Sequence, residues 1–418
     1  MRGRLSRPFA PFAVPNYRRF YAGQAFARCG AWVQTVAELW LVLSLTGSGV
    51  SLGLTTAFQF LPMLLLGAWA GLLADRLPKR HILLAAQAWM VVPVGTLLVL
   101  TATGTAELWM VYVLVFARGL GRAFDNPVRQ SFVMEVVGPQ HVAAAVSLNS
   151  ALVSSARMVG PAVGGILIAA AGVVPCFALT SAAFLAAIGA LITLDGSALR
   201  PTPPAPRRPG QLRDALRHVR ATPGLLTPLA AMALVGTLAF NFPVLLPLMA
   251  RYTFDEGPAG FGALAAAMGA GAVLGAVANA GRSTQSIRTL GRLGIAFGLA
   301  MLGLAAAPGF GAALAALVLV GAASAAFTAT TNSLMQLAAD PAMRGRAMAL
   351  WSVVYLGSTP LGGPVVGWVA EHAGARAGVL VGAAAALAAG SGLLFASRHA
   401  VRSLSDGGLG RMAESPTR

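Results

Sequence analysis

Long runs of apolar residues, separated by short polar connections, dominate the chain. The runs 39–45, 61–73 and 110–116 are almost free of charge. Such segments are apolar on every face, so the solvent around them is expected to be lipid. Each longer segment can cross the ~30 Å hydrocarbon core of a bilayer as a helix. The pattern therefore predicts an all-α integral membrane protein.

Twelve transmembrane helices follow from the hydrophobicity pattern. Their predicted spans are 19–46, 50–74, 80–103, 107–127, 142–170, 174–194, 224–250, 259–280, 287–307, 310–334, 346–370 and 376–396. The longest connection, 195–223, is rich in proline and arginine and divides the chain near its middle. We therefore expect a tail (1–18), a six-helix bundle (19–194), a linker (195–223), a second six-helix bundle (224–396) and a tail (397–418).

Basic residues fall almost entirely in alternate connections. One set, with both tails, holds Arg2, Arg4, Arg7, Arg76, Lys79, Arg80, Arg129, Arg207, Arg208, Arg213, Arg217, Arg220, Arg282, Arg288, Arg344, Arg398, Arg402 and Arg411. The other set holds Arg251, with Asp255 and Glu256 nearby. Because positive loops stay in the cytosol, both termini are predicted to be cytosolic in a multi-pass inner-membrane protein. The basic N-terminus has no apolar core of a signal peptide, so it reads as a cytosolic tail.

Composition agrees with a membrane protein and excludes several other classes. The chain is 57% hydrophobic and 10% charged, with a net charge of +17. The arginines lie in short connections, where anionic lipid headgroups explain them better than nucleic acid does. The two cysteines lie in separate apolar segments and suggest neither a disulfide framework nor a metal site. No nucleotide-binding loop or enzyme site is recognisable, so we expect no cofactor and no ATP hydrolysis.

Two glycine patterns recur at nearly half the chain length. They are Gly67-x-x-x-Gly71-x-x-x-Asp75 against Gly271-x-x-x-Gly275-x-x-x-Asn279, and Gly160-Pro161-x-x-Gly164 against Gly363-Pro364-x-x-Gly367. Small residues recur in any membrane helix, but two different patterns in the same order indicate a duplicated six-helix unit. The glycine–proline pairs are also candidate bend points.

Segment 71–80 resembles the signature loop between helices 2 and 3 of the major facilitator superfamily. Gly71, Asp75, Arg76 and Arg80 match its pattern, while Pro78 replaces the usual second glycine. The resemblance implies that Asp75 and its basic neighbours form a latch that closes the cytosolic side. Segment 160–165 is similar to the antiporter motif of drug exporters, although Ala156 stands where that motif has a further glycine.

Other stretches are similar to the branch that holds the enterobactin exporter and the macrolide-efflux-like proteins. The stretches are 16–20, 23–24, 126–130, 245–248, 261–262 and 344–348. The resemblance implies two pseudo-symmetric six-helix bundles and a proton-coupled exporter of small amphipathic compounds that works by alternating access. It also implies that the first, fourth, fifth, seventh, tenth and eleventh helices line the cavity.

Polar side chains concentrate on those helices. Placing an ionisable group at the centre of a membrane helix costs about 3 kcal/mol or more in free energy, so each such group is expected to have a functional or structural role. Candidate cavity residues are Gln24, Arg28, Thr35, Arg118, Arg157, Asn241, Asn332, Trp351 and Tyr355. For Arg157 a structural tie between helices, and for Trp351 and Tyr355 ordinary packing between the halves, remain alternatives. Arg122, Asp125 and Arg129 are expected at the cytosolic end of their helix.

Glu38 is the candidate proton carrier by elimination. Of the 13 acidic residues, it alone is predicted well inside a helix, on a polar stripe with Gln24, Arg28 and Thr35. Asp125 is expected near water, and Glu135 in a cytosolic loop. The five histidines are expected at helix ends or in loops. A proton-driven carrier needs a group that takes up and releases a proton inside the membrane.

Two other functions remain open from sequence: import of a nutrient, and a non-transporting receptor or scaffold. The repeat, the latch motif and the buried charges favour transport, because a scaffold has little use for a costly polar cavity. The expected partners are a small-molecule substrate, protons and lipids, with a monomeric protein.

Replacement of the latch aspartate tests the resemblance directly. Asp75→Ala should strongly reduce transport while the protein still inserts, because the latch contact belongs to one conformation and its loss favours the inward-open state. Transport assays in vesicles measure the effect. Unchanged transport would remove the latch from the mechanism.

Overall fold

The computed structural model describes residues 9–74, 77–200, 217, 219, 222–280, 285–340 and 343–413. Within these residues the regular structure is entirely helical. The first half holds α1 (Pro15–Thr46), α2 (Gly49–Ala74), α3 (Lys79–Ala102), α4 (Leu108–Val137), α5 (Val142–Ala171) and α6 (Val174–Ile192). Short 3-10 turns lie at Ala10–Ala13, Pro139–His141 and Gly196–Ala198.

The second half begins after the predicted linker, most of which lies outside the described residues. It holds α8 (Pro223–Leu238), α9 (Phe242–Leu248), the π-helical turn η4 (Met249–Thr253), α10 (Pro258–Ala280), α11 (Ile287–Ala305), α12 (Phe310–Ala338), α13 (Arg344–Gly357), α14 (Thr359–Ala373) and α15 (Ala375–Ala413). The prediction of an all-α bundle of membrane-length helices is confirmed.

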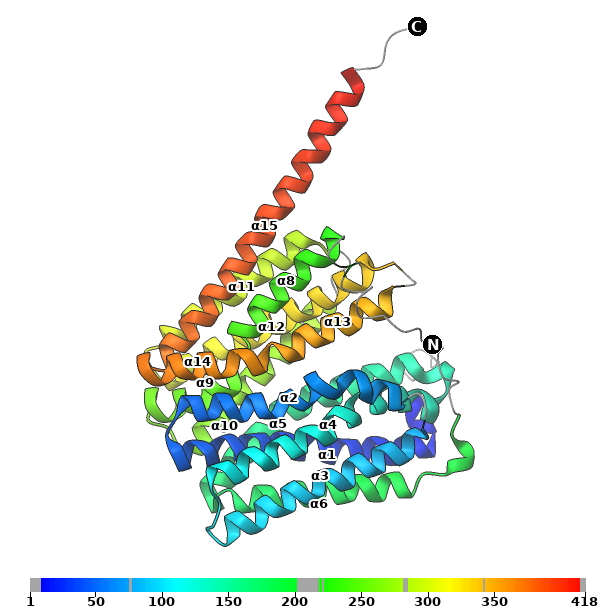
Figure 1. Cartoon of the computed structure of the whole chain (residues 1–418), viewed down its shortest axis with the longest axis vertical. Coiled ribbons are helices and arrows are strands. Elements are labelled where there is room, and N and C mark those ends of the chain that lie inside the picture. Colours follow the sequence, from blue (N-terminus) through cyan, green and yellow to red (C-terminus); the bar gives the residue numbers. More distant parts are fainter. Residues whose placement is uncertain are drawn as a thin grey trace, which may run out of the picture.

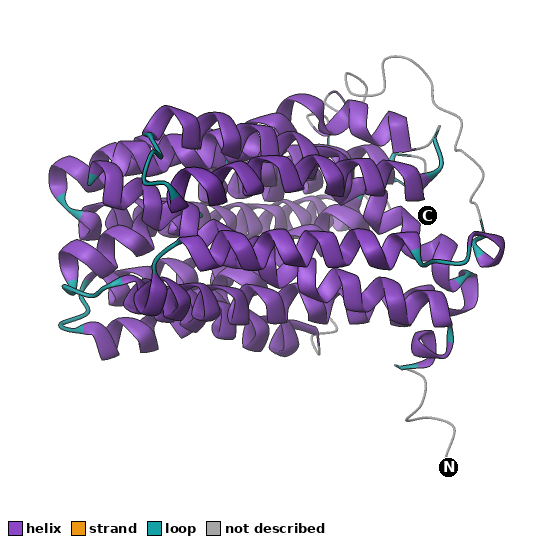
Figure 2. Ribbon diagram, turned by 90° about the horizontal axis from the view of Figure 1, so that it is seen from below, coloured by secondary structure: helices purple, strands orange, loops and turns teal. Residues whose placement is uncertain are grey.

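The helices run side by side (Figures 1 and 2). The sequence colours of Figure 1 show that they form two groups, which follow the halves of the chain. In Figure 1 the first half occupies the lower part of the view, and α8 and α11–α14 the upper part. The groups meet mainly where α2 packs on α14 and α5 packs on α10. This arrangement places α1 and α4 inside the first half, where their polar side chains are shielded from lipid.

Eleven helical segments among the described residues are long and apolar enough to cross a membrane. The predicted fourth span is not among them. Its helix, α4, has 30 residues but carries too many charges to qualify as uniformly apolar. The predicted end at 127 was wrong, because α4 continues through Pro127 to Val137. A proline removes one backbone donor, and in a membrane helix neighbouring groups can make up for that loss.

Two predicted spans contain a break. The seventh is divided at 239–241, where the Phe240 N–H bonds the Val235 carbonyl 3.2 Å away, and Pro243 lies in the first turn of the next segment. The eleventh is divided at Ser358, before Pro360. Helix α5 runs through Gly160–Pro161 and α14 through Gly363–Pro364 without interruption. A proline lies next to each break. The sequence pattern did not distinguish these prolines from the ones that lie inside continuous helices.

Hydrogen bonds join the two halves at the end where α1 stops and α2 starts. The Glu371 carboxylate accepts from Ser48 Oγ (2.6 Å) and from the backbone N–H of Val50 (2.9 Å). Arg251 donates to the Leu43 carbonyl (3.1 Å), and the Tyr252 hydroxyl to the Gly47 carbonyl (3.1 Å). Gly47 ends α1 with a φ of 65°, a conformation that suits glycine. We call this region the closed end.

Glycines let the halves approach closely beside the closed end. A Cβ added to Gly53 of α2 would lie 2.7 Å from the Cα of Pro364 in α14. A Cβ on Gly165 of α5 would lie 2.8 Å from the Cα of Gly262 in α10. Backbone-to-backbone contact of this kind is a common way for membrane helices to associate. Of the duplicated glycine–proline pattern, Gly363 and Gly367 lie against α2 of the other half, whereas Gly160 and Gly164 lie against α1 of their own half.

A side chain at Gly53 should prevent closure at this end. Gly53→Val would place methyl groups against the α14 backbone, which cannot move aside as a side chain can. The two halves should separate there. Spin labels at Thr103 and Ala373, with both native cysteines replaced, would report the increase in distance.

Gly95→Val in α3 is the matched control, because nothing lies within 4 Å of the added Cβ. It should leave the label distance unchanged. An equal distance in Gly53→Val and the parent protein would contradict the packing role of Gly53.

Candidate functional site

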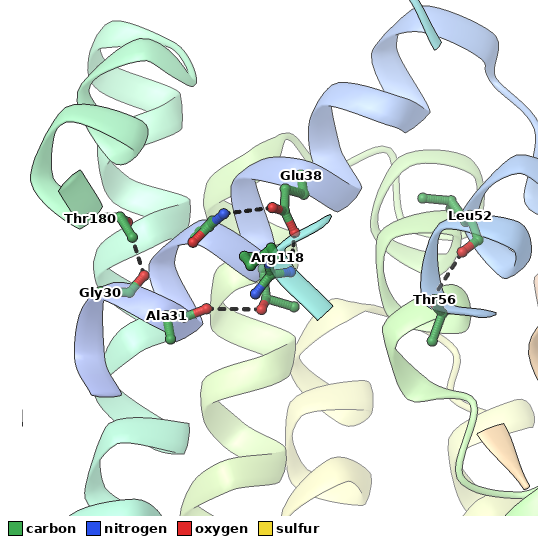
Figure 3. Close-up of polar contacts among 9 residues, drawn as sticks. Gly30, Ala31, Glu38, Leu52, Thr56, Arg118 and Thr180 are labelled. Atoms are coloured by element: carbon green, nitrogen blue, oxygen red, sulfur yellow. Dashed lines mark hydrogen bonds and ion pairs between the residues drawn. The ribbon is translucent and has the colours of Figure 1, made fainter. Parts of the chain in front are cut away.

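A buried ion pair between α1 and α4 lies at the centre of the candidate site. The Glu38 carboxylate accepts a hydrogen bond from Gln34 Nε2 at 2.7 Å, one helical turn earlier. Its other oxygen accepts from Arg118 of α4. Figure 3 shows Glu38 and Arg118 pointing toward each other from the two helices. The sequence identified both residues as candidates, and the structure shows that they are paired.

Both members of this pair are buried. Glu38 is 1% exposed and Arg118 is fully buried. Arg118 Nε and Nη1, and Gln34 Oε1, have no hydrogen-bond partner among the described residues. A buried charge is tolerated when an opposite charge accompanies it, and removal of one partner leaves the other uncompensated. The pair therefore ties α1 to α4 and leaves donors free for another group.

A second ion pair lies further along α4. Arg129 binds both oxygens of Asp125 from one turn away, with Nε at 2.8 Å from Oδ2. Gln87 of α3 donates to the same carboxylate at 3.1 Å. The expectation that Arg122, Asp125 and Arg129 lie at a cytosolic helix end was wrong. Because α4 continues to Val137, these residues lie two to four turns inside it.

A cavity brings these groups together. The volume open to the centres of water molecules is about 110 Å³. The total empty space, with the opening of the cavity included, is about 780 Å³. Its lining residues come from α1, α2, α3, α4, α6 and α9: Ala27, Arg28, Ala31, Trp32, Thr35, Gln59, Phe60, Gln87, Met90, Arg118, Arg122, Asp125, Asn126, Arg129, Phe184 and Pro243. All but Pro243 belong to the first half.

Of the predicted cavity residues, the structure places Arg28, Thr35 and Arg118 in the lining. The α4 residues at 122, 125, 126 and 129 were missed. The signal that could have found them is the spacing of 118, 122, 125 and 129, which puts all four on one face of a helix. That face was overlooked because the helix was predicted to end at 127.

The other predicted residues lie outside the lining. Gln24 is buried without a hydrogen-bond partner among the described residues. Arg157 is exposed, with its guanidinium 5.5 Å from the Trp32 ring. Asn241 Nδ2 donates to the Thr237 carbonyl across the break between α8 and α9, and Asn332 Oδ1 accepts from Gln336 within α12.

Trp351 and Tyr355 stack on each other in α13, with ring centroids 5.1 Å apart. Tyr355 also meets Phe240 edge-on at 6.2 Å. The pair therefore packs within the second half in this conformation, away from the cavity.

The latch motif is only partly described. Asp75 and Arg76 lie outside the described residues, as does the side-chain environment of Gly71. Arg80 donates to the carbonyls of Leu191 (3.0 Å) and Ile192 (2.8 Å) at the end of α6. Glu135, expected in a loop, is buried near the end of α4 and pairs with Lys79.

Among the described residues, no group of three or more His, Cys, Asp or Glu side chains could hold a metal ion.

Comparisons with known proteins agree with this architecture. A family model described as "Transmembrane secretion effector" matches residues 6–407. The multidrug efflux pump Tap of Mycolicibacterium fortuitum is 28% identical over 84% of this chain and 88% of its own. The enterobactin exporter EntS of Salmonella choleraesuis is 26% identical over 76% of each chain. An uncharacterised MFS-type transporter of Bacillus subtilis, YfiS, is 28% identical, and this chain spans 51% of its length.

Solved structures show the same fold. A bacterial homologue of the human lysosomal transporter Spinster, in an inward-facing unoccupied conformation, has a TM-score of 0.74 at 15% identity. The match covers 92% of this chain and 97% of the other. The predicted major facilitator fold and the resemblance to its efflux branch are confirmed.

The buried pair predicts a non-additive effect of substitution. Arg118→Gln should destabilise the protein by about 3 kcal/mol, because it leaves the Glu38 carboxylate without its counter-charge. The double variant Glu38→Gln/Arg118→Gln should lose less stability than the two single variants added together. Thermal unfolding in detergent measures all three. Additive losses would show that the pair is not coupled.

Proposed function

We propose that this chain, which belongs to the transmembrane secretion effector family of the major facilitator superfamily, exports small amphipathic organic compounds in exchange for protons. It is a major facilitator transporter and not an enzyme. Export is supported by relatives named as an efflux pump and an exporter. We place the protein in the inner membrane with both termini in the cytosol. We expect it to work as a monomer.

The observation that carries this proposal is the Glu38–Arg118 pair beside the cavity. Glu38 is a buried acid about two turns from the end of a membrane helix, next to a space that a substrate can enter. Ionised, it holds Arg118 and so ties α1 to α4. Protonation removes that charge and weakens the tie. A proton can thereby change the relative stability of two arrangements of the helices.

The closed end supplies the other element of alternating access. If the arginine-rich connections are cytosolic, the contacts of Glu371, Arg251 and Tyr252 seal the outer side. The present conformation then corresponds to an inward-facing state. We propose that the Asp75 latch closes the opposite side when these outer contacts separate.

Glu38→Gln tests the coupling. The variant keeps a polar side chain of the same size but cannot exchange a proton. It should still bind substrate yet lose efflux against a gradient in inverted vesicles energised by a pH difference. Substrate accumulation and equilibrium binding are measured side by side.

Glu107→Gln is the matched control, because Glu107 is an exposed acid just before α4. It should pump like the parent. If Glu38→Gln also pumps against a gradient, Glu38 is not the proton carrier.

A further inference from the structure

The cavity wall carries more positive than negative charge. Arg28 of α1 and Arg118, Arg122 and Arg129 of α4 line it, with Asp125 as the acidic lining residue. Arg129 is bound to Asp125, and Arg118 is neutralised by Glu38. Arg28 and Arg122 are left without a carboxylate within ion-pair distance among the described residues.

The carboxylates nearest to these two arginines, Glu38 and Asp125, act on them only at a distance, because each is already paired with another arginine. Neither Arg28 nor Arg122 has an ion pair or hydrogen bond within the part of the chain that the structure describes. The Arg122 guanidinium lies 5.9 Å from the centre of the Phe60 ring, a weak cation–π contact. The walls from α2, α3, α6 and α9 add only neutral lining side chains. Uncompensated guanidinium groups at membrane depth are costly, which indicates a ligand that compensates them.

The free donors suit an oxyanion. Guanidinium groups bind carboxylate and phosphate oxygens through paired N–H donors, and such bonds are strong where water is excluded. Arg118 contributes two more donors, Nε and Nη1, which are fully buried and unpartnered among the described residues. Arg122 is close enough to Arg28 and Arg118 to interact with their charges, so the three act on one space.

Most of the remaining lining is apolar, with four neutral polar side chains among it. Trp32, Phe60, Met90 and Phe184 offer surface for the body of an organic molecule. We propose that the cavity selects organic oxyanions, molecules with an apolar or aromatic body and at least one carboxylate or phosphate group, and that Arg28 and Arg122 are its specificity-determining residues. This inference rests on the proposed function only in taking the cavity as the transport site.

The charge of such a substrate also bears on the direction of transport. An inside-negative membrane potential drives negative charge outward. Export of an anion therefore gains from the potential, in addition to any gain from the proton gradient.

Two xanthene dyes with similar ring systems test the selectivity: carboxyfluorescein, an anion, and rhodamine 6G, a cation. Binding to the purified full-length protein is measured by fluorescence anisotropy at one pH and salt concentration. The parent should bind carboxyfluorescein at least about tenfold more tightly. Arg28→Gln and Arg122→Gln should each weaken that binding about tenfold, the loss of one charge-assisted contact, without weakening rhodamine 6G binding.

Arg18→Gln is the matched control, because Arg18 is an exposed arginine on the same helix as Arg28. It should leave both affinities unchanged. Arg122→Lys, which keeps the charge, should retain most of the preference for the anion even if Arg122→Gln proves too unstable to purify. Equal binding of the two dyes by the parent, or unchanged anion binding in both glutamine variants, would overturn the proposal.

The outcome is separable from the proton-coupling test. Anion selectivity with normal uphill efflux in Glu38→Gln would refute proton coupling through Glu38 and support the oxyanion site. Loss of uphill efflux in Glu38→Gln, together with equal binding of the two dyes by the parent protein, would support proton coupling through Glu38 and refute the oxyanion site.

Discussion

The ion pair between Glu38 and Arg118 is the interaction on which the rest of the site depends. Either charge alone would be strongly unfavourable in a low-dielectric interior. The folded protein therefore keeps α1 and α4 in contact. Once α4 is held in this way, the side chains that share the face of Arg118 are directed to the same space. The position of the cavity therefore follows from a single pairing.

The two halves contribute differently in this conformation. Charged and hydrogen-bonding groups of the cavity come from the first half, while the second half contributes Pro243. Polar groups of the second half, such as Asn241 and Asn332, bond to residues four positions away in the same half. The halves themselves meet through glycines and through hydrogen bonds at the closed end. They can thus move apart there without breaking the Glu38–Arg118 pair, as alternating access requires.

Much of this was accessible from sequence, and the failures have definite causes. The polar stripe of α1 indicated Glu38, Arg28 and Thr35 as candidates, because polar residues on one face of an apolar helix need a shielded environment. The structure places Arg28 and Thr35 in the cavity lining and Glu38 in a buried ion pair. The α4 residues were misplaced because Pro127 was taken as a helix end. Trp351 and Tyr355 were candidates by residue type, but a helical wheel does not distinguish a cavity from a neighbouring helix.

The sequence by itself determined the membrane-spanning pattern, the duplicated halves, the family, and the presence of an acid buried within the first helix. These depend on composition and on spacing along the chain, which lipid and backbone hydrogen bonding translate directly into helices. The tertiary structure decided which charges are paired and which are left free. Glu38 and Arg118 are 80 residues apart, and the helix packing that brings them together also leaves Arg28 and Arg122 without a partner among the described residues. Charge compensation in a membrane protein depends on which helices are neighbours, and spacing within one helix does not contain that information.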